Sequence, residues 1–422
     1  MRSALLPVAA LLFGVSLLLA GQGLQATLLP VRASLESFSA LSIGLMGGTY
    51  FLGFTLGCLK GGELVIRVGH VRVFAAMTAL ASATPLLHGL VLGPLIWAAL
   101  RLVTGFCFAV LYVVIESWLN DVSTNENRGT VFSVYTMISL TVLALGQMML
   151  LLNDPAELYL FALASVLVSI AVVPVVLSTA QGPQQPHSVR LDIPRLYRIS
   201  PAGTLGCLGA GLANGAFWAL APAFTLGLSA NYGIAAWFMT ASVLGGALAQ
   251  GPVGHLSDRI GRRTVLAGCA VVGSIVAVII VLMANTLPVT GLVLLGGAWG
   301  ACAFPMYPLA VANANDYAQP AEYVMVSSGL LLMYGLGAIA GPLLASIGMT
   351  LFDYTGLYVY TAAVHVLLAA YMLIRINTRA WTPDEEHVDF SESMLAAHTK
   401  SQIYEEESQA LAARRAADSG SP

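Results

Sequence analysis

A single arginine stands inside a long apolar segment of this sequence, where its charge can do chemistry that the surrounding residues cannot. Arg101 lies about seven residues after Pro94, in an apolar run that ends at Leu119. Because burying a guanidinium among apolar residues is costly, this position predicts a function, either binding of an anion or coupling to an ion. The alternative is that the long side chain only extends to the nearer end of the run.

Polar and aromatic side chains in other apolar runs could complete a binding site around Arg101. Gln22 and Gln25 belong to the first run, and Asn214 and Trp218 belong to the seventh. Gln22 and Asn214 are equivalent positions, 192 residues apart, in an internal repeat. The alternatives are hydrogen bonds between helices for the amides and simple packing for the aromatic rings. The predicted substrate-binding residues are Gln22, Gln25, Arg101, Tyr135, Asn214, Trp218, Tyr307 and Tyr334.

The composition shows which elements must position these side chains. Charged residues make up 9% of the 422 residues, against about 25% in soluble proteins, and hydrophobic residues make up 58%. The charges fall between apolar runs of about 20 residues, the length that crosses a bilayer. We therefore predict an all-α membrane protein with twelve transmembrane helices. The expected spans are Leu5–Leu29, Ile43–Ile66, Val73–Leu92, Pro94–Leu119, Val131–Leu152, Leu158–Leu177, Ala202–Leu226, Tyr232–His255, Val265–Ala284, Leu287–Ala312, Val324–Leu351 and Gly356–Ile374.

The basic residues predict the orientation. Of the 14 Lys and Arg up to Arg375, eleven fall on the side of the two termini, and only Arg32 falls in a loop on the other side. The positive-inside rule then places both termini in the cytoplasm. Arg2 with the apolar stretch after it resembles a signal peptide, but its repeat counterpart near Gly215 favours a retained first span.

The repeat divides the chain into two halves. An offset of 192 pairs Gly23 with Gly215, and an offset of 195 pairs Gly146 with Gly341. We expect a first six-helix bundle over residues 1–178, a cytoplasmic linker over 179–200, a second bundle over 201–376 and an acidic cytoplasmic tail over 377–422. Such duplication brings the substrate site of a transporter to the interface of the halves, near the middle of the bilayer.

One loop carries a family signature. Gly254 to Arg263 reads G-H-L-S-D-R-I-G-R-R and resembles the G-x-x-x-D-R-x-G-R-R loop of the major facilitator superfamily (MFS); Gly62 to Arg72 is a degenerate counterpart. Glu116 to Asn120 and Ala312 to Asp316, with the residues that follow each, resemble the bacterial YcaD-type group. The resemblance implies two pseudo-symmetric six-helix bundles, transport by alternating access, no enzymatic activity and a bacterial inner membrane.

The resemblance also implies a cytoplasmic gate. In the superfamily the loop latches the two halves together when the carrier faces outward, and here Asp258 can pair with Arg259 or Arg262. The alternative is that the arginines only set the topology. The counterpart of Asp258 in the first half is Ile66, so the two cytoplasmic contacts should be unequal. The predicted gate residues are Arg67, Glu116, Asp121, Arg128, Gly254, Asp258, Arg259, Gly261, Arg262 and Asp316.

These features together predict a secondary carrier, monomeric in the lipid bilayer, for a small anionic or zwitterionic organic solute. A proton or another ion could couple transport. Efflux of hydrophobic drugs or toxins is an alternative, weakened because Leu143 to Gln147 lacks the antiporter glycine pattern. A membrane sensor that transports nothing is the alternative from another class. The sequence carries no nucleic-acid, metal or cofactor signature, and its five cysteines are scattered.

Overall fold

The computed structural model describes residues 2–121, 123, 128–176, 192–319 and 322–378. Twelve helical segments in this part are long and apolar enough to cross a membrane, which confirms the predicted all-α membrane fold. The helices are α1 (Arg2–Leu35), α2 (Ala40–Val68), α3 (His70–Leu90), α4 (Pro94–Asp121), α5 (Arg128–Met148), α6 (Tyr159–Ile170), α7 (Val172–Val176), α8 (Ile193–Ile199), α9 (Pro201–Leu228), α10 (Gly233–Ile260), α11 (Arg262–Met283), α12 (Val289–Ala303), α13 (Met306–Asn315), α14 (Tyr323–Leu351) and α15 (Gly356–Thr378), with 3-10 turns at Met149–Leu152 and Asp353–Thr355.

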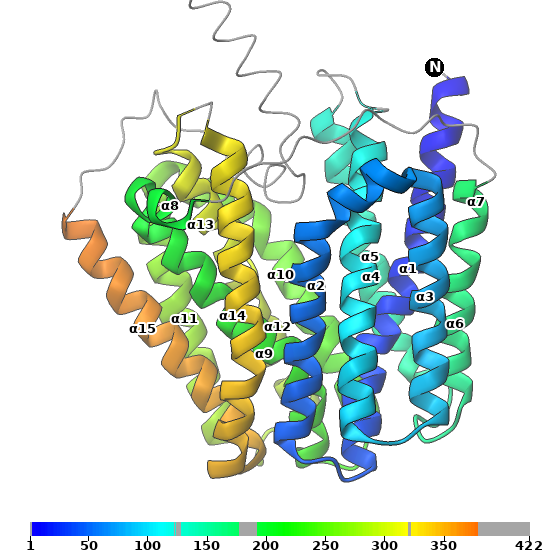
Figure 1. Cartoon of the computed structure of the whole chain (residues 1–422). Coiled ribbons are helices and arrows are strands. Elements are labelled where there is room, and N and C mark those ends of the chain that lie inside the picture. Colours follow the sequence, from blue (N-terminus) through cyan, green and yellow to red (C-terminus); the bar gives the residue numbers. More distant parts are fainter. Residues whose placement is uncertain (1, 122, 124–127, 177–191, 320–321, 379–422) are drawn as a thin grey trace, which may run out of the picture.

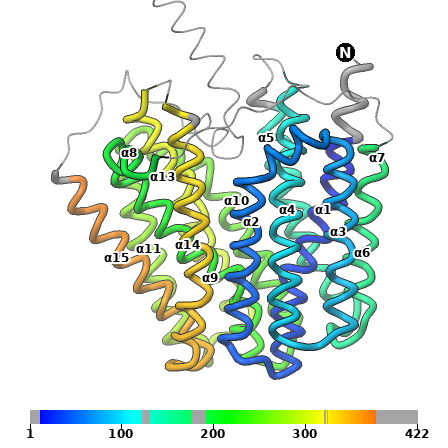
Figure 2. Tube along the Cα trace, viewed as in Figure 1, coloured from blue at the N-terminus to red at the C-terminus, as the bar shows by residue number. Residues whose placement is uncertain are grey.

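The helices form two bundles side by side, α1 to α7 in one and α9 to α15 in the other (Figure 1). Helices α2 and α14 run next to each other where the bundles meet (Figure 2), and α5 also contacts α10 there. Helix α1 begins and α15 ends on the same side of the molecule, called the terminal side below. The two bundles are called the first half and the second half.

Several helices extend beyond the apolar runs that predicted them. Helix α1 continues through Arg32 to Leu35, although Arg32 was expected in a loop. Arg32 instead forms an ion pair with Glu36, with 2.7 Å between Nη2 and Oε1. The hydropathy of a run limits only the part of a helix that lies in lipid, whereas backbone hydrogen bonds continue into polar sequence. The helical ends are therefore longer than the apolar runs.

The tenth predicted span is present as Val289–Asn315, but a turn that the sequence did not predict interrupts its helix. Helix α12 ends at Ala303 and α13 begins at Met306, with Phe304 and Pro305 between them. Pro305 has no N–H to donate to the carbonyl four residues earlier, and its ring crowds that turn. The regular helical hydrogen bonding is therefore interrupted at this turn, although Phe304 and Pro305 keep helical backbone dihedrals.

Glycines at repeated positions set the closest helix approaches in both halves. A Cβ on Gly105 would lie 2.0 Å from the carbonyl oxygen of Tyr50, where α4 crosses α2. A Cβ on Gly300, at the 195-residue offset, would lie 2.1 Å from the carbonyl oxygen of Ser242 in the equivalent crossing of α12 and α10. The two halves therefore share the same backbone-to-backbone contacts, as the repeat predicts.

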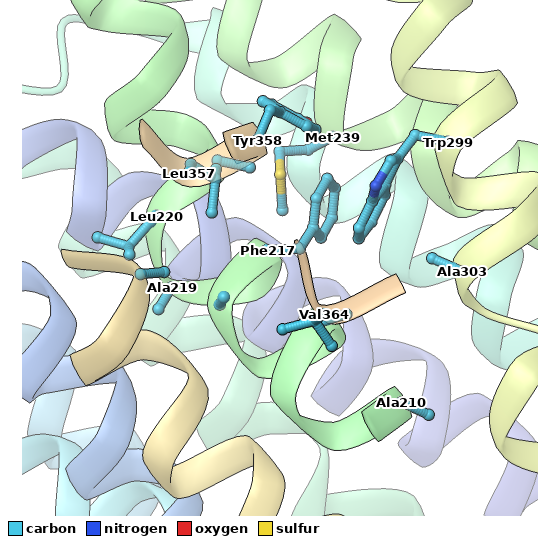
Figure 3. Packing of buried hydrophobic residues seen from close by; sticks show 14 of the residues in the cluster. Ala210, Phe217, Ala219, Leu220, Met239, Trp299, Ala303, Leu357, Tyr358 and Val364 are labelled. Atoms are coloured by element: carbon cyan, nitrogen blue, oxygen red, sulfur yellow. The ribbon is translucent and has the colours of Figure 1, made fainter. Parts of the chain in front are cut away.

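The second half has an aromatic core. The rings of Phe217 on α9 and Trp299 on α12 are stacked with centroids 4.7 Å apart, and Tyr358 on α15 meets Trp299 edge-on at 6.0 Å. Figure 3 shows these rings together with Met239 and Leu357. All three ring side chains are fully buried. Large rings buried in this way hold α9, α12 and α15 together.

The expected linker contains a short helix, α8. Asp192 caps its N-terminus by accepting a hydrogen bond from the backbone N–H of Arg195. The Arg195 guanidinium donates to Glu322, next to α14, through Nε at 2.9 Å and Nη2 at 2.5 Å. Helix α8 is thus attached to the second half. Residues 179–191 of the linker and residues 379–422 of the predicted acidic tail lie outside the described residues.

Replacing Gly105 by Ala should lower the free energy of unfolding by about 1–3 kcal/mol, because the methyl group overlaps the α2 backbone. Gly251→Ala is the matched control, since a Cβ there meets nothing within 4 Å and alanine favours the helix. Thermal unfolding of the purified proteins in detergent measures both. Equal unfolding temperatures for the two variants would contradict a close contact between Gly105 and the α2 backbone.

Candidate substrate-binding site and gate

A cavity of about 1100 Å³ lies between the two halves. Its wall is built from both halves and includes parts of α1, α2, α4, α5, α9, α13 and α14. All eight residues predicted to bind substrate lie in this wall: Gln22, Gln25, Arg101, Tyr135, Asn214, Trp218, Tyr307 and Tyr334. Residues far apart in the sequence thus line one space, while their role in binding stays a prediction.

The cavity extends to the terminal side and is closed at the other end. Lys60 and Glu63 line it near the terminal end of α2, where their side chains are 70% and 59% exposed. Near the opposite end, a Cβ on Gly47 of α2 would lie 2.2 Å from the Cβ of Ala219. A Cβ on Gly44 would lie 2.6 Å from the carbonyl oxygen of Pro342. Small residues therefore let the halves touch at this end.

Arg101 stands over an aromatic ring inside the cavity. Its guanidinium carbon lies 4.1 Å from the centroid of the Tyr50 ring, a cation–π contact. Arg101 takes part in none of the ion pairs that the structure shows among the described residues. A tyrosine face attracts a cation but does not neutralise it, so the charge stays available to an anion in the cavity.

Hydrogen bonds hold the Tyr50 ring in place. Gln22 Nε2 donates to the Tyr50 hydroxyl at 3.0 Å, and the Tyr112 hydroxyl donates to Gln22 Oε1 at 2.7 Å. The chain of contacts joins α1, α2 and α4. The sequence did not predict Tyr50 as part of the site. Its ring lies under Arg101 because Gly105, one helical turn after Arg101, lets α4 pack directly against the α2 backbone at Tyr50.

The second half supplies aromatic rings at the break between α12 and α13. Trp218 stacks on Phe304, with centroids 5.7 Å apart and planes 14° from parallel. Tyr307 meets Tyr334 with ring centroids 4.7 Å apart. Discontinuous helices commonly form the substrate sites of transporters, because irregular backbone is tolerated where it lines a cavity. The cavity thus has a cation on one wall and stacked rings on the other.

The predicted gate contains a buried ion cluster on the terminal side. Arg262 contacts Asp258 through Nη1 and Asp316 through Nε, the latter at 3.3 Å, and it donates to Ser257 at 2.9 Å. The side chains of Arg262 and Asp316 are 1% and 2% exposed. These partners all belong to the second half. In this conformation the cluster therefore braces the ends of α10, α11 and α13.

The other predicted gate residues lie in different surroundings. Glu116 lines the cavity, whereas Arg67, Asp121 and Arg259 are exposed. Gly254 is buried, and the side chain of Arg128 lies outside the described part of the chain. Gly261 has φ +94° and its repeat partner Gly69 has φ +95°, a backbone conformation that favours glycine. Both loops therefore turn between helices in the same way.

The comparisons with known proteins decide the family. The sequence profile described as the Major Facilitator Superfamily matches residues 11–195 and 204–409. The chain belongs to the Major Facilitator Superfamily. It is similar to the MFS-type transporter YcaD of Escherichia coli and of Shigella flexneri, each 27% identical over 382 residues that cover 89% of this chain and 97% of the relative. The predicted resemblance is confirmed, and the relatives are transporters rather than enzymes.

Solved structures share the major facilitator fold. The nucleoside transporter NupG superposes with a TM-score of 0.76 at 16% identity, covering 90% of this chain and 100% of that one. A bacterial homolog of the human lysosomal transporter Spinster, inward-facing and occupied, gives 0.72 at 15% identity, with 90% and 99% covered. Identities this low support the fold and no more.

Replacing Arg262 by Ala should destabilise this major facilitator protein by about 3–5 kcal/mol, because buried Asp316 then loses its cation. Arg259→Ala, on the exposed side of the same loop, should change stability by less than about 0.5 kcal/mol. Chemical or thermal unfolding of the purified variants in detergent measures the loss of stability in each. Two variants with the same small effect would show that the buried cluster does not brace the helices.

Proposed function

We propose that this transporter is a secondary carrier that moves a small organic anion or zwitterion by alternating access, with Arg101 binding the negatively charged end. The supporting observation is the guanidinium of Arg101 in the cavity wall, 4.1 Å over the Tyr50 ring. A guanidinium presents several N–H donors in one plane and matches a carboxylate with two parallel hydrogen bonds. An anion in the cavity would thus supply the counter-charge.

The proposal includes an orientation. We place the protein in the bacterial inner membrane with both termini in the cytoplasm, supported by the basic residues on the terminal side and the enterobacterial relatives. The terminal side is then the cytoplasmic side. A cavity that reaches Lys60 and is closed near Gly47 corresponds to an inward-facing conformation.

The transport cycle follows from which end of the interface is closed. In our proposal the two halves rock about the cavity, so that the contact of Gly47 with Ala219 opens while the cytoplasmic ends approach each other. The predicted gate loop and Glu116 would then meet the opposite half. Glu116, which lines the cavity, is the carboxylate we propose for proton coupling, since it can be reached from the cytoplasm.

Efflux of hydrophobic drugs is the second candidate function. The stacked Trp218 and Phe304 and the paired Tyr307 and Tyr334 favour it, because such rings also bind neutral aromatic molecules. The two functions differ in their dependence on Arg101. Binding of a neutral drug does not need the guanidinium, whereas binding of an anion does.

Arg101→Gln should weaken the binding of transported organic anions by about 10- to 100-fold, because a charge-assisted hydrogen bond is lost while the side chain stays polar. The measurement is uptake and counterflow of a panel of radiolabelled organic anions, zwitterions and neutral aromatic drugs in proteoliposomes.

Arg198→Gln is the matched control, since it removes an exposed arginine of α8 that lies outside the cavity and outside the predicted gate. It should leave uptake unchanged. Anion uptake that is equal in wild type and Arg101→Gln would refute the role of Arg101, and uptake restricted to neutral drugs would favour the second candidate.

A further inference from the structure

Two amide side chains in the cavity wall have buried polar atoms without a hydrogen-bond partner. Gln25 on α1 is 2% exposed, and neither its Nε2 nor its Oε1 has a partner. Asn214 on α9 is 3% exposed, and its Oδ1 has none. Both residues line the cavity, and α1 and α9 contact each other across the interface of the halves. The two halves thus each contribute one buried amide group to the same wall.

The neighbouring amide in this wall behaves differently. Gln22, one turn from Gln25 on α1, is bonded at both ends to the hydroxyls of Tyr50 and Tyr112. Gln22 therefore has a structural role, because it holds the Tyr50 ring on which the Arg101 guanidinium lies. Gln25 has no such structural explanation, and a buried polar group without a partner is costly to keep.

We propose that Gln25 and Asn214 form a subsite for a neutral amide group of the substrate, so that the carrier prefers organic anions that also contain a peptide-like amide. An amide has one N–H donor and one carbonyl acceptor, and Gln25 offers one acceptor and donors in return. The rings of Tyr50 and Trp218 lie in the same wall and suit an aromatic or acyl group attached to that amide. The proposal rests on the anion carrier proposed above.

The specificity of such a subsite has a physical basis. A site that is built to hydrogen-bond a substrate group discriminates against an analogue that lacks the group, because the polar atoms of the site then stay unpaired. An N-acyl amino acid combines a carboxylate for Arg101 with an amide for Gln25 and Asn214. Its ketomethylene analogue, with CH2 in place of N–H, keeps the shape and charge but loses the donor.

The first test uses the protein without any ligand. Gln25→Leu should unfold at a temperature no lower than wild type, because it removes buried polar atoms that have no partner. Gln22→Leu should unfold at a lower temperature, because it leaves two tyrosine hydroxyls unpaired. A loss of stability in Gln25→Leu as large as in Gln22→Leu would mean that Gln25 serves the fold, and would overturn the proposal.

The second test measures binding of three matched probes to the protein in lipid nanodiscs. N-benzoylglycine carries both groups, its ketomethylene analogue lacks the amide N–H, and its methyl ester lacks the charge. Wild type should bind N-benzoylglycine at least about tenfold more tightly than the ketomethylene analogue. Gln25→Leu and Asn214→Leu should each reduce this preference, with the ketomethylene analogue still bound.

Gln147→Leu is the control, because Gln147 is a fully buried amide on α5 that is not part of the cavity wall. It should keep the tenfold preference. Equal binding of the two anions by wild type, or the same loss of preference in Gln147→Leu as in Gln25→Leu, would overturn the amide subsite alone. Binding of the methyl ester as tight as that of N-benzoylglycine would overturn the anion carrier, and a protein that binds none of the probes fails both proposals.

Discussion

The cost of placing a guanidinium inside a membrane is the constraint on which the rest of the structure depends. Arg101 lies on a transmembrane helix, and lipid cannot solvate its charge. Two features lower this cost: Arg101 lines a cavity that reaches the terminal side, and its guanidinium lies over the face of the Tyr50 ring. Such a cavity exists only because two bundles touch at one end and separate toward the other. The charge and the two-bundle architecture are therefore linked.

The close helix crossings connect this constraint to the repeat. Gly105 lets α4 contact the backbone of α2 at Tyr50, and the same crossing recurs at Gly300 in the second half. The side chains next to the two crossings differ between the halves. The first half carries Arg101 and its hydrogen-bonded support, whereas Gly296, the counterpart of Arg101 at the 195-residue offset, packs against the ring of Phe238 in the second half. Duplication thus explains the scaffold, and the difference between the halves explains the asymmetric site.

Much of the fold could be predicted from the sequence because apolar runs of sufficient length have few alternatives in a bilayer. Arg101 was found because charge inside such a run is conspicuous. Tyr50 was missed because its contact depends on a tertiary crossing that no local pattern specifies. The break at Pro305 was missed for a related reason: Pro222 and Pro252 stay inside continuous helices, so a proline alone does not show where a helix ends.

Alkylation of Cys58 tests the central claim most directly, since this partly buried cysteine lines the cavity that contains Arg101. The other four cysteines are replaced by serine, and a membrane-impermeant maleimide is applied to vesicles of either orientation. Faster labelling from the side of the termini, slowed by organic anions in wild type but not in Arg101→Gln, is the predicted result. Labelling at the same rate from both sides, or with no effect of anions in wild type, would contradict a cavity that opens to the terminal side and binds anions at Arg101.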